Sequence, residues 1–469
     1  MIERGKQIDT VERDGNRRVL EVDAEIIANV LDLIESEQRG MVLNIIADLY
    51  PADIAALLEH LPMDTAKRMF RWLTIEQGSE VLTDLDDDFR AGLLDATRPQ
   101  RLAALIDEMD TDDAADVLAD LPDQVAQEVL PDLADAENLT ELLGYAEDTA
   151  GGLMTTEYVA VPGSWTVSQV TEEVRKKAEV VEPIHAIYVT DNDGRHIGSI
   201  SLTRLLLSRE SISAASIIDL EAISVPTEID QEDVARIMAR YDLISLPVVN
   251  DSDQIVGRIT IDDIVDVIRE EAEEDIQRMS GVAGGEEPTD SVLRVSRGRL
   301  PWLLMGMIGA GLSAKVIYSF EEALQSAVVL AAFIPIVMAT AGNAGIQSSA
   351  IAVQGLAAGD IWTSDIKRRF GKELAVSIIN GLLLALAMAI GVIVFFRTDQ
   401  TAELAVTASL TIVIVIIVAT LIGAMVPLIL NKAGIDPALA TGPFITAMND
   451  ILGIAVFFML ASWLYLGVT

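Results

Sequence analysis

The sequence contains no cysteine and three histidines, His60, His185 and His196, in 469 residues. Without cysteine there is no disulfide framework, no thiolate metal site and no cysteine nucleophile. With so few histidines, a histidine-rich metal centre is nearly excluded. The sequence also shows no nucleophile–base set and no phosphate-binding loop, so we do not expect an enzyme.

Basic residues are scarce, with 33 Lys and Arg against 73 Asp and Glu. The imbalance lies before Pro301, where 26 basic residues face 64 acidic ones, because the remainder holds seven and nine. Such a polyanion disfavours nucleic acid and anionic lipid as partners, and favours cation capture or a partner of opposite charge. A solvated acidic surface explains any single carboxylate equally well.

The N-terminal stretch MIERGKQIDTVERDGNRRVL has no apolar core, which a secretory signal would need. We therefore expect the N-terminal part to stay in the cytoplasm.

Residues 1–145 predict an acidic helical N domain. Apolar residues recur at helical spacing, and PADIAALLEHLP at 51–62 returns as TDDAADVLADLP at 111–122, which indicates a short helical solenoid. Asp112, Asp113 and Asp116 stand at one predicted helix start. They either cap that helix or, as three repelling carboxylates, hold a cation that bridges to another domain.

Residues 146–275 contain one α/β unit twice. IYVTDNDGRHIGSISLTRLL is answered by LPVVNDSDQIVGRITIDDIV, with glycines 198 and 257 in matching places. These repeats resemble the tandem CBS pair, a regulatory module that often binds adenosyl ligands. Thr260 and Asp263 match the family's ribose-contacting pattern. The first repeat has Ser201 and Arg204 at these positions. Thr260 can also be a helix cap. We therefore expect ATP or another adenine nucleotide at the second repeat at most.

The last helix of this pair, around 262–275, is unusually acidic. Eight carboxylates face two arginines, Arg269 and Arg278, and like charges at helical spacing destabilise a helix by a few tenths of a kcal/mol each. A bound divalent cation would relieve this repulsion, and carboxylate oxygens suit Mg²⁺ or Ca²⁺.

Residues 276–300 connect this part to the first apolar run, passing from a Gly-rich piece to a basic helix with Arg294, Arg297 and Arg299. These arginines follow the positive-inside rule, as an ordinary juxtamembrane anchor also would.

Residues 301–469 contain five stretches long enough to cross a bilayer, at about 301–320, 325–356, 374–396, 405–430 and 441–466. The loops rich in Lys and Arg all fall on the N-terminal side, which predicts a multi-pass cell membrane protein (inner or plasma membrane) with its N-terminus in the cytoplasm and its C-terminus outside.

Two of these stretches are too polar to face lipid. The second carries Gly342, Asn343 and Gln347, and the fifth carries Thr446, Asn449 and Asp450. Polar helix at membrane depth either lines water or packs tightly on protein, and an intramembrane carboxylate costs about 2.5–3.5 kcal/mol unless it has a partner. One carboxylate cannot neutralise a divalent ion, so we expect a homodimer that brings two together around a hydrated ion.

Several long motifs occur in family order: YAEDTAGGLMTTEYVAV, TIDDIVDVIREEAEEDI, P-x6-GNAGIQS and IDPALATGPFITAMNDILG. They resemble the MgtE family of Mg²⁺ channels and transporters. The resemblance implies a homodimer in which cytosolic Mg²⁺ bridges the N domain, the CBS pair and a plug helix to close the pore. It places Asp450 as the pore carboxylate, and it implies as sensor ligands Asp112, Asp116, Asp230, Asp263, Asp266, Glu274 and Asp275.

The sequence thus predicts a multi-domain chain, with an α-helical solenoid N domain, an α/β tandem CBS pair and an all-α transmembrane domain of five helices. The function that we expect is Mg²⁺ uptake through a channel closed by its own ion. A proton- or Na⁺-coupled transporter with Asp450 as relay is the alternative, and a non-conducting receptor would leave the oxygens of the second span unexplained.

Overall fold

The computed structural model describes residues 24–95, 97–178, 181, 183–218, 223–282, 284, 286, 291–357, 366–396 and 398–467. It divides into two compact units, Met1–Val267 and Ile268–Thr469, each of which is described by itself. The segment without an apolar core, residues 1–23, and part of the connector, residues 287–290, lie outside the described residues. The finer domain boundaries given above stay a prediction.

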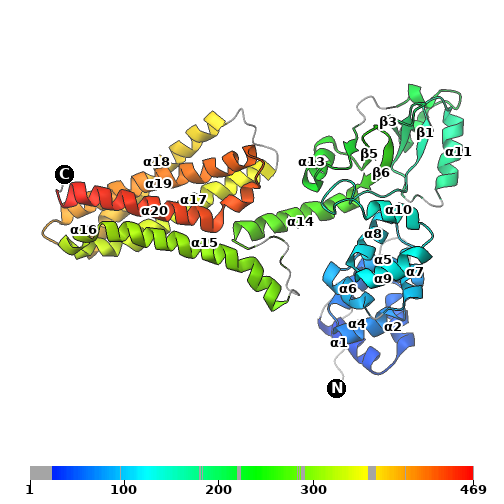
Figure 1. The fold of residues 1–469 in the computed structure, drawn as a ribbon, viewed down its shortest axis with the longest axis horizontal. Coiled ribbons are helices and arrows are strands. Elements are labelled where there is room, and N and C mark those ends of the chain that lie inside the picture. The colour runs from blue at the N-terminus through cyan, green and yellow to red at the C-terminus, as the bar shows by residue number, and fades with distance from the viewer. Residues whose placement is uncertain are drawn as a thin grey trace, which may run out of the picture. The chain divides into compact units, whose positions relative to one another are not determined.

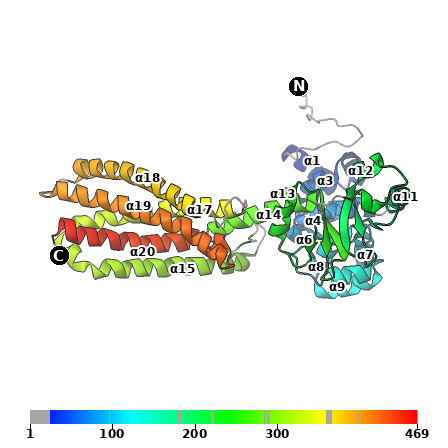
Figure 2. The same ribbon diagram turned by 90° about the horizontal axis from the view of Figure 1, so that it is seen from above.

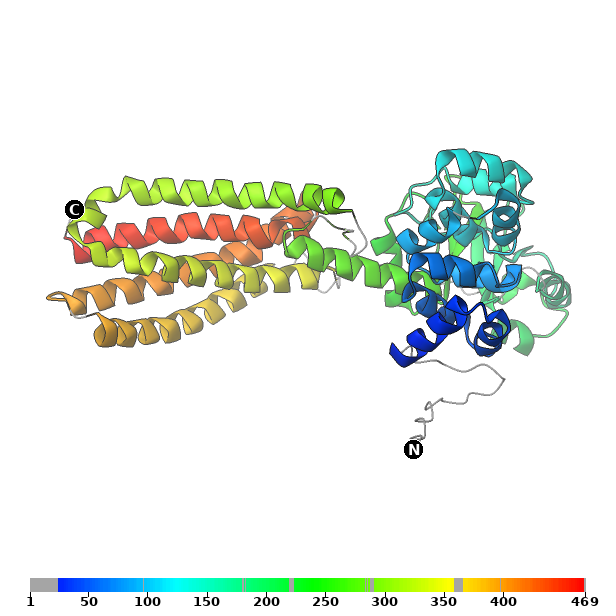
Figure 3. The ribbon, with the colours of Figure 1, turned by 90° about the horizontal axis from the view of Figure 1, so that it is seen from below.

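The first unit begins with a double row of short helices (Figure 1; Figure 3). Helices α3, α5, α7 and α9 contact one another in one row, and α4, α6, α8 and α10 form the other, as expected for the predicted solenoid. Leu57, Leu58 and Leu82 are fully buried, and burying such a side chain contributes about 1.5–3 kcal/mol. The helices are α1 (Ala24–Glu35), α2 (Arg39–Ile46), α3 (Pro51–Glu59), α4 (Met63–Phe70), α5 (Ile75–Thr83), α6 (Asp87–Leu94), α7 (Pro99–Ile106), α8 (Thr111–Asp120), α9 (Asp123–Val129) and α10 (Ala136–Leu142), with a 3₁₀ turn at Leu130–Asp132.

The same unit then folds into two matching α/β repeats. Each has a three-stranded sheet in chain order, with a parallel pair followed by an antiparallel pair. Gly198 pairs with Val189 and Gly257 with Val248, each beside a register shift, which confirms the repeat read from the sequence. The elements are β1 (Ala160–Pro162), α11 (Val167–Lys177), β2 (Ala186–Thr190), β3 (His196–Ser201), α12 (Leu202–Leu207), β4 (Val225–Pro226), α13 (Gln231–Tyr241), β5 (Ser245–Val249), β6 (Ile255–Thr260) and the start of α14 (Ile261–Met279), with a 3₁₀ turn at Ala214–Ser216. Helix α14 continues beyond Val267 into the second unit.

The second unit is all helical and contains five helices long and apolar enough to cross a membrane (Figure 2). Neighbours in the bundle run in the order α18, α19, α17, α20, α15. Its helices are α15 (Val292–Ser319), α16 (Glu321–Ser326), α17 (Ile334–Ala357), α18 (Ile366–Phe395), α19 (Thr401–Lys432) and α20 (Gly442–Leu460); 3₁₀ segments span Val328–Phe333 and Pro437–Ala440, and a π-turn follows at Ala461–Tyr465.

The predicted fold class is confirmed. Helices α15, α18 and α19 begin before the predicted spans, whereas α17 and α20 begin after theirs. The basic residues Arg294 to Arg299 belong to α15 itself, which starts at Val292 and runs without a break into the first span. Composition separates the basic residues from the apolar run, but it does not show that one helix contains both. A helix continues as long as its backbone hydrogen bonds are satisfied, whatever the side chains are.

Candidate functional site

Asp450 lies in the middle of α20, a helix of 19 residues. About 20 residues are needed to cross a bilayer. Its side chain is half-buried, and its Oδ1 atom is buried without a hydrogen-bond partner in the part of the chain that the structure describes. A buried carboxylate oxygen in this state is costly unless a cation, a water molecule or a second chain supplies the missing partner.

The neighbouring residue Asn449 is 1% exposed and anchors α20 to α17. Its Nδ2 atom donates to the Ala341 carbonyl at 3.5 Å. A Cβ on Gly345 would lie 1.9 Å from the same nitrogen, so the two helices meet here only because position 345 has no side chain. Since successive helical residues point about 100° apart, fixing Asn449 also fixes the direction of Asp450.

Of the other predicted pore residues, Gly342, Asn343 and Gln347 lie on two faces of α17, and Thr446 lies on α20. Gly342 faces α20, where a Cβ would lie 3.5 Å from Thr446 Cγ2. Thr446 itself donates to the Gly442 carbonyl at 2.9 Å. Asn343 and Gln347 lie on the exposed face of α17, so within one chain they are not packed against α20.

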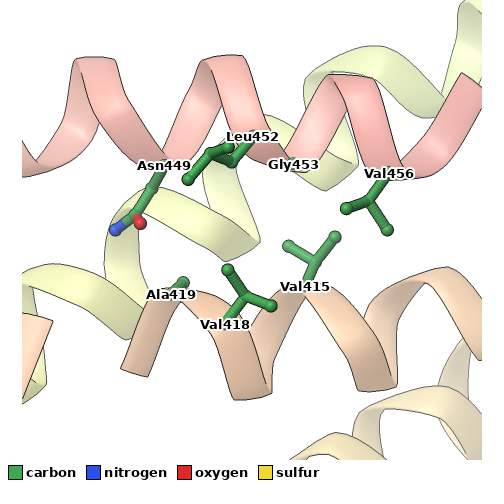
Figure 4. A pocket seen from close by; sticks show the side chains of 7 residues that line it. All are labelled: Val415, Val418, Ala419, Asn449, Leu452, Gly453 and Val456. Carbon is green, nitrogen blue, oxygen red and sulfur yellow. The ribbon is translucent and has the colours of Figure 1, made fainter. Parts of the chain in front are cut away.

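A crevice between α19 and α20 lies next to Asn449 and is too narrow to hold a water molecule. Asn449 is the one polar side chain among its seven lining residues, which Figure 4 shows facing one another from the two helices: Val415, Val418, Ala419, Asn449, Leu452, Gly453 and Val456. A cation there would meet valine and leucine side chains, so this crevice is a packing gap and not an ion path.

In the first unit, the start of α8 faces the start of α14. Burial and the charges of Asp113, Asp263 and Asp110 raise the pKa of Asp112 well above its usual range, and Asp112 Oδ1 is buried without a partner among the described residues. Burial and the charge of Asp263 raise the pKa of Asp113 to about 7. These carboxylates therefore crowd together, and the charge of Arg90 only partly offsets the rise in the pKa of Asp113.

Asp263 has a partner on its own helix. Burial raises its pKa to about 6, opposed by the Thr260 hydroxyl, which donates to Asp263 Oδ2 at 2.7 Å. The Thr260 amide also donates to this oxygen at 3.3 Å. Thr260 and Asp263 thus form the local helix-start pair that was the alternative to ribose binding.

Two further predicted ligands lie elsewhere in the first unit. Asp230 is exposed and caps α13, where its Oδ1 accepts from the Glu232 amide at 2.9 Å. Asp266 lies near Asp84 at the end of α5. Burial and the nearby charge of Asp266 raise the pKa of Asp84. The structure therefore distributes the predicted sensor carboxylates over several contacts of α14 and α13.

Asp116 lies beside a buried arginine. Arg90 on α6 is 7% exposed and pairs with Asp87 and Asp120 at 2.7 Å each. The charges of Asp87, Asp120 and Glu147 act on Asp116 together with that of Arg90. Arg90 therefore offsets only part of the negative charge at the end of α8, where burial still raises the pKa of Asp116 to about 7.

The beginning of α8 is capped by a residue far along the chain. Glu157 Oε2 accepts from the Thr111 amide at 3.3 Å and from the Thr111 hydroxyl at 2.8 Å, and the Thr155 hydroxyl also donates to it. The Thr156 amide donates to the Thr111 hydroxyl at 2.8 Å. Neither Asp112 nor Asp113 caps this helix; Glu157 does, and it holds α8 against the segment that leads into the α/β repeats.

We expect Glu157→Gln to lower the free energy of unfolding of the first unit by about 1.5–3 kcal/mol, because hydrogen bonds to a charged group contribute about this much. Thermal unfolding of the full chain, with hydrogen exchange over residues 111–120, measures the change. Glu172→Gln is the control, because Glu172 is exposed and pairs with Arg175 on its own helix. Equal stability of the two variants would contradict a capping role for Glu157.

The raised pKa values at α8 and α14 also predict a pH dependence. A carboxyl that is more basic in the folded state binds protons more tightly there, so its contribution is present at low pH and is lost as pH rises from about 4 to about 7 for Asp113. In metal-free buffer the first unit should therefore melt at lower temperature at pH 8 than at pH 6.

Asp113→Asn should raise the melting temperature at pH 8 by about 2–4 °C per kcal/mol of relieved repulsion and should flatten the pH dependence. Asp132→Asn is the control, because Asp132 is exposed in the same domain. A pH profile unchanged by Asp113→Asn would show that this cluster does not control the stability.

In the second unit, the end of α14 is tied to the start of α20. Arg278 forms ion pairs with Glu274 and with Asp436, and Asp436 Oδ1 also accepts from the Ala438 amide at 2.7 Å. Burial, followed by the charges of Asp436 and Glu271, raises the pKa of Asp275 to about 6. Asp436 thus belongs to the acidic group around Glu274 and Asp275.

Backbone contacts reinforce this tie. Gly442, at a φ of +52°, begins α20, and a Cβ there would lie 2.5 Å from the Met279 carbonyl. A Cβ on Gly281, at a φ of +77°, would lie 2.6 Å from Pro443. Both positions need glycine, since other residues rarely adopt positive φ and the space is filled.

Known relatives cover almost the whole chain. The magnesium transporter MgtE of Bacillus subtilis is 30% identical over 442 residues, which is 93% of this chain and 97% of the relative. The protein of the same name from Thermus thermophilus is 31% identical over 452 residues, 94% of this chain and 99% of the relative. The chain belongs to the MgtE family of magnesium transporters.

Three family models match consecutive parts of this MgtE family member. The MgtE intracellular N domain matches residues 49–148, the CBS domain matches 150–210 and 214–270, and the divalent cation transporter model matches 334–460. A solved cytosolic domain of the Mg²⁺ channel MgtE in complex with ATP is 34% identical, covers 51% of this chain and 99% of that chain, and has a TM-score of 0.48. The family models and the two relatives, together with the five apolar helices, make the chain a membrane protein of the MgtE family.

No group of three or more Asp, Glu or His side chains among the described residues converges closely enough to hold a metal ion. The donors nevertheless suit a hard, hydrated cation, because the buried oxygens without a partner among the described residues include a carboxylate oxygen of Asp112 and one of Asp450. The roles of all the predicted site residues stay predictions.

Sequence reasoning missed Arg90, Glu157 and Asp436. Of these, only Arg90 has a local signal, because it lies three residues after its partner Asp87.

Proposed function

We propose that this chain forms a homodimeric, passively conducting Mg²⁺ channel for uptake across the cell membrane, with its N-terminus in the cytoplasm. The observation that carries the proposal is Asp450, in the middle of a membrane helix, whose buried Oδ1 has no hydrogen-bond partner among the described residues. The MgtE family membership supplies the ion.

The dimer follows from charge and exposure. Two Asp450 carboxylates at one depth would neutralise a divalent cation, and a two-fold axis is the commonest way to bring them together. Asn343 and Gln347 on the exposed face of α17 would supply oxygens to the same path. Because Mg²⁺ parts reluctantly with its water, carboxylates that do not converge on one point can hold it through that water.

Cytosolic carboxylates would sense the ion. Bound Mg²⁺ would supply positive charge to the carboxylates of Asp112, Asp116, Asp230, Asp263, Asp266, Glu274 and Asp275, to which we add Asp436. When these residues lose that charge, their repulsion separates α8 from α14. Because α14 ends in the Arg278–Asp436 pair next to α20, its movement would reach the helix that carries Asp450.

Limited proteolysis of the full chain tests the sensor. We expect Mg²⁺ in the millimolar range to protect the first unit from cleavage, and Asp112→Asn with Asp263→Asn to need at least about tenfold more Mg²⁺. Asp132→Asn is the matched control. Cleavage that does not change with Mg²⁺ would exclude the sensor, but it would not test the proposal that the chain conducts Mg²⁺.

We also propose that the CBS pair binds an adenine nucleotide at the second repeat, where Thr260 and Asp263 lie. Ribose hydroxyls would take the place of the hydrogen bond between Thr260 and Asp263. The first repeat has Ser201 and Arg204 at the matching positions, so we propose no nucleotide there. Binding of ATP to the full chain should weaken about tenfold in Thr260→Val, and ATP binding unchanged by this substitution would contradict the assignment.

A further inference from the structure

The N domain contains one cavity that is lined by arginines. Its volume is about 310 Å³, and its walls come from α1, the turn after it, α2 and the end of α4 (Figure 1). The lining residues are Ile34, Glu37, Arg39, Arg68, Arg71 and Trp72. Three guanidinium groups around one cavity are unexpected in the part of the chain where acidic residues outnumber basic ones by 64 to 26.

These arginines have no carboxylate partners among the described residues. Arg39 and Arg68 form no ion pair there, and Arg71 Nε donates to the Lys67 carbonyl of its own helix at 3.1 Å. Elsewhere in the same unit Arg90 and Arg236 each pair with two carboxylates. A shortage of acidic residues therefore does not explain the unpaired charges.

The helix dipole explains only part of the arrangement. Arg68 and Arg71 stand at the end of α4, where a cation is stabilised by about 0.3–1 kcal/mol. Arg39 is the first residue of α2, the end at which a cation is disfavoured, and that end has no side-chain cap. An anion in the cavity would compensate both Arg39 and the uncapped helix start.

We propose that this cavity binds a phosphate-bearing small molecule, with phosphate oxygens on the three guanidinium groups and a flat ring against Trp72. Arginine forks match phosphate oxygens in pairs and stack on aromatic rings. The volume is at the lower end of the range for small-molecule sites, about 300–1,000 Å³. Glu37, exposed at the rim, can accept a hydrogen bond from a sugar hydroxyl or a ring amine.

Hydrogen exchange of the full chain in metal-free buffer tests this site apart from the CBS pair. We expect ATP to protect residues 34–42 and 66–73, and Arg39→Gln with Arg68→Gln to weaken the apparent affinity at least tenfold. Arg98→Gln is the control, because Arg98 is exposed in the same domain and outside the cavity.

Two further probes identify the source of the phosphate. Protection by tripolyphosphate as well as ATP would support the arginine cluster as the main binding group, whereas protection by ATP alone would support the ring contact with Trp72. Protection that needs nanodiscs containing phosphatidylglycerol, with the same arginine dependence, would support the phosphate site with a lipid headgroup as its source. No protection by any probe, or equal protection in the double variant, would overturn the proposal.

Discussion

Asp450→Asn should lower Mg²⁺ flux into liposomes at least about 100-fold, which corresponds to about 2.7 kcal/mol. The substitution keeps the shape of the side chain and removes the charge that would attract a hydrated divalent ion into a low-dielectric path. In a homodimer it removes two charges at once. The Asp450 oxygen that is buried without a partner is thereby replaced by a neutral group, so the fold should be at least as stable as before.

Asp399→Asn is the matched control, because Asp399 lies exposed between α18 and α19 and outside the spans. Its flux should equal that of the unaltered chain. Unaltered flux in Asp450→Asn would remove this residue from the ion path, and the same loss in both variants would indicate a general effect of surface charge.

Gly345→Ala should lower flux about tenfold and reduce the stability of the second unit by about 1–3 kcal/mol. The new Cβ would lie 1.9 Å from Asn449 Nδ2 and 2.7 Å from Ile445 Cγ2, so these two side chains, or α20 with them, must shift away from α17. Displacing Asn449 releases the anchor that sets the direction of Asp450. Thermal unfolding in detergent and flux in liposomes measure the two effects on the same preparation.

Gly391→Ala on α18 is the control, because a Cβ there meets nothing within 4 Å. It should leave both measurements unchanged or slightly improved, since alanine favours helix. Adding Asn449→Ala to Gly345→Ala removes the closer of the two clashes and should restore part of the stability. A Gly345→Ala variant as stable and active as Gly391→Ala would contradict the close contact between α17 and α20.

The sequence was informative wherever a physical pattern repeats. Helical spacing and the return of the 51–62 segment at 111–122 predicted a short helical solenoid, which the structure forms as a double row of helices. The paired positions of Gly198 and Gly257 predicted two equivalent sheets. The length of the apolar stretches predicted all five spans, because a helix needs about 20 consecutive apolar residues to cross a bilayer.

Contacts between distant segments could not be predicted in the same way. Glu157 caps α8 across 46 residues of sequence, and nothing local to either segment indicates the pairing. The neighbours Asn449 and Asp450 carry similar polar side chains, yet only the packing of α20 on Gly345 shows that Asn449 serves as an anchor. The Asp436-Pro437 loop gave the signal of a helix start, and its ion pair with Arg278 appears only once the chain has folded.

The most direct measurement is Mg²⁺ current through the purified chain in a planar bilayer, at fixed voltage and without any proton or Na⁺ gradient. The account predicts a current that persists under these conditions, falls as Mg²⁺ is raised on the side of the N domain, and loses that fall in Asp112→Asn with Asp263→Asn. A current that requires a proton or Na⁺ gradient, or one that does not change with Mg²⁺ on that side, would contradict it.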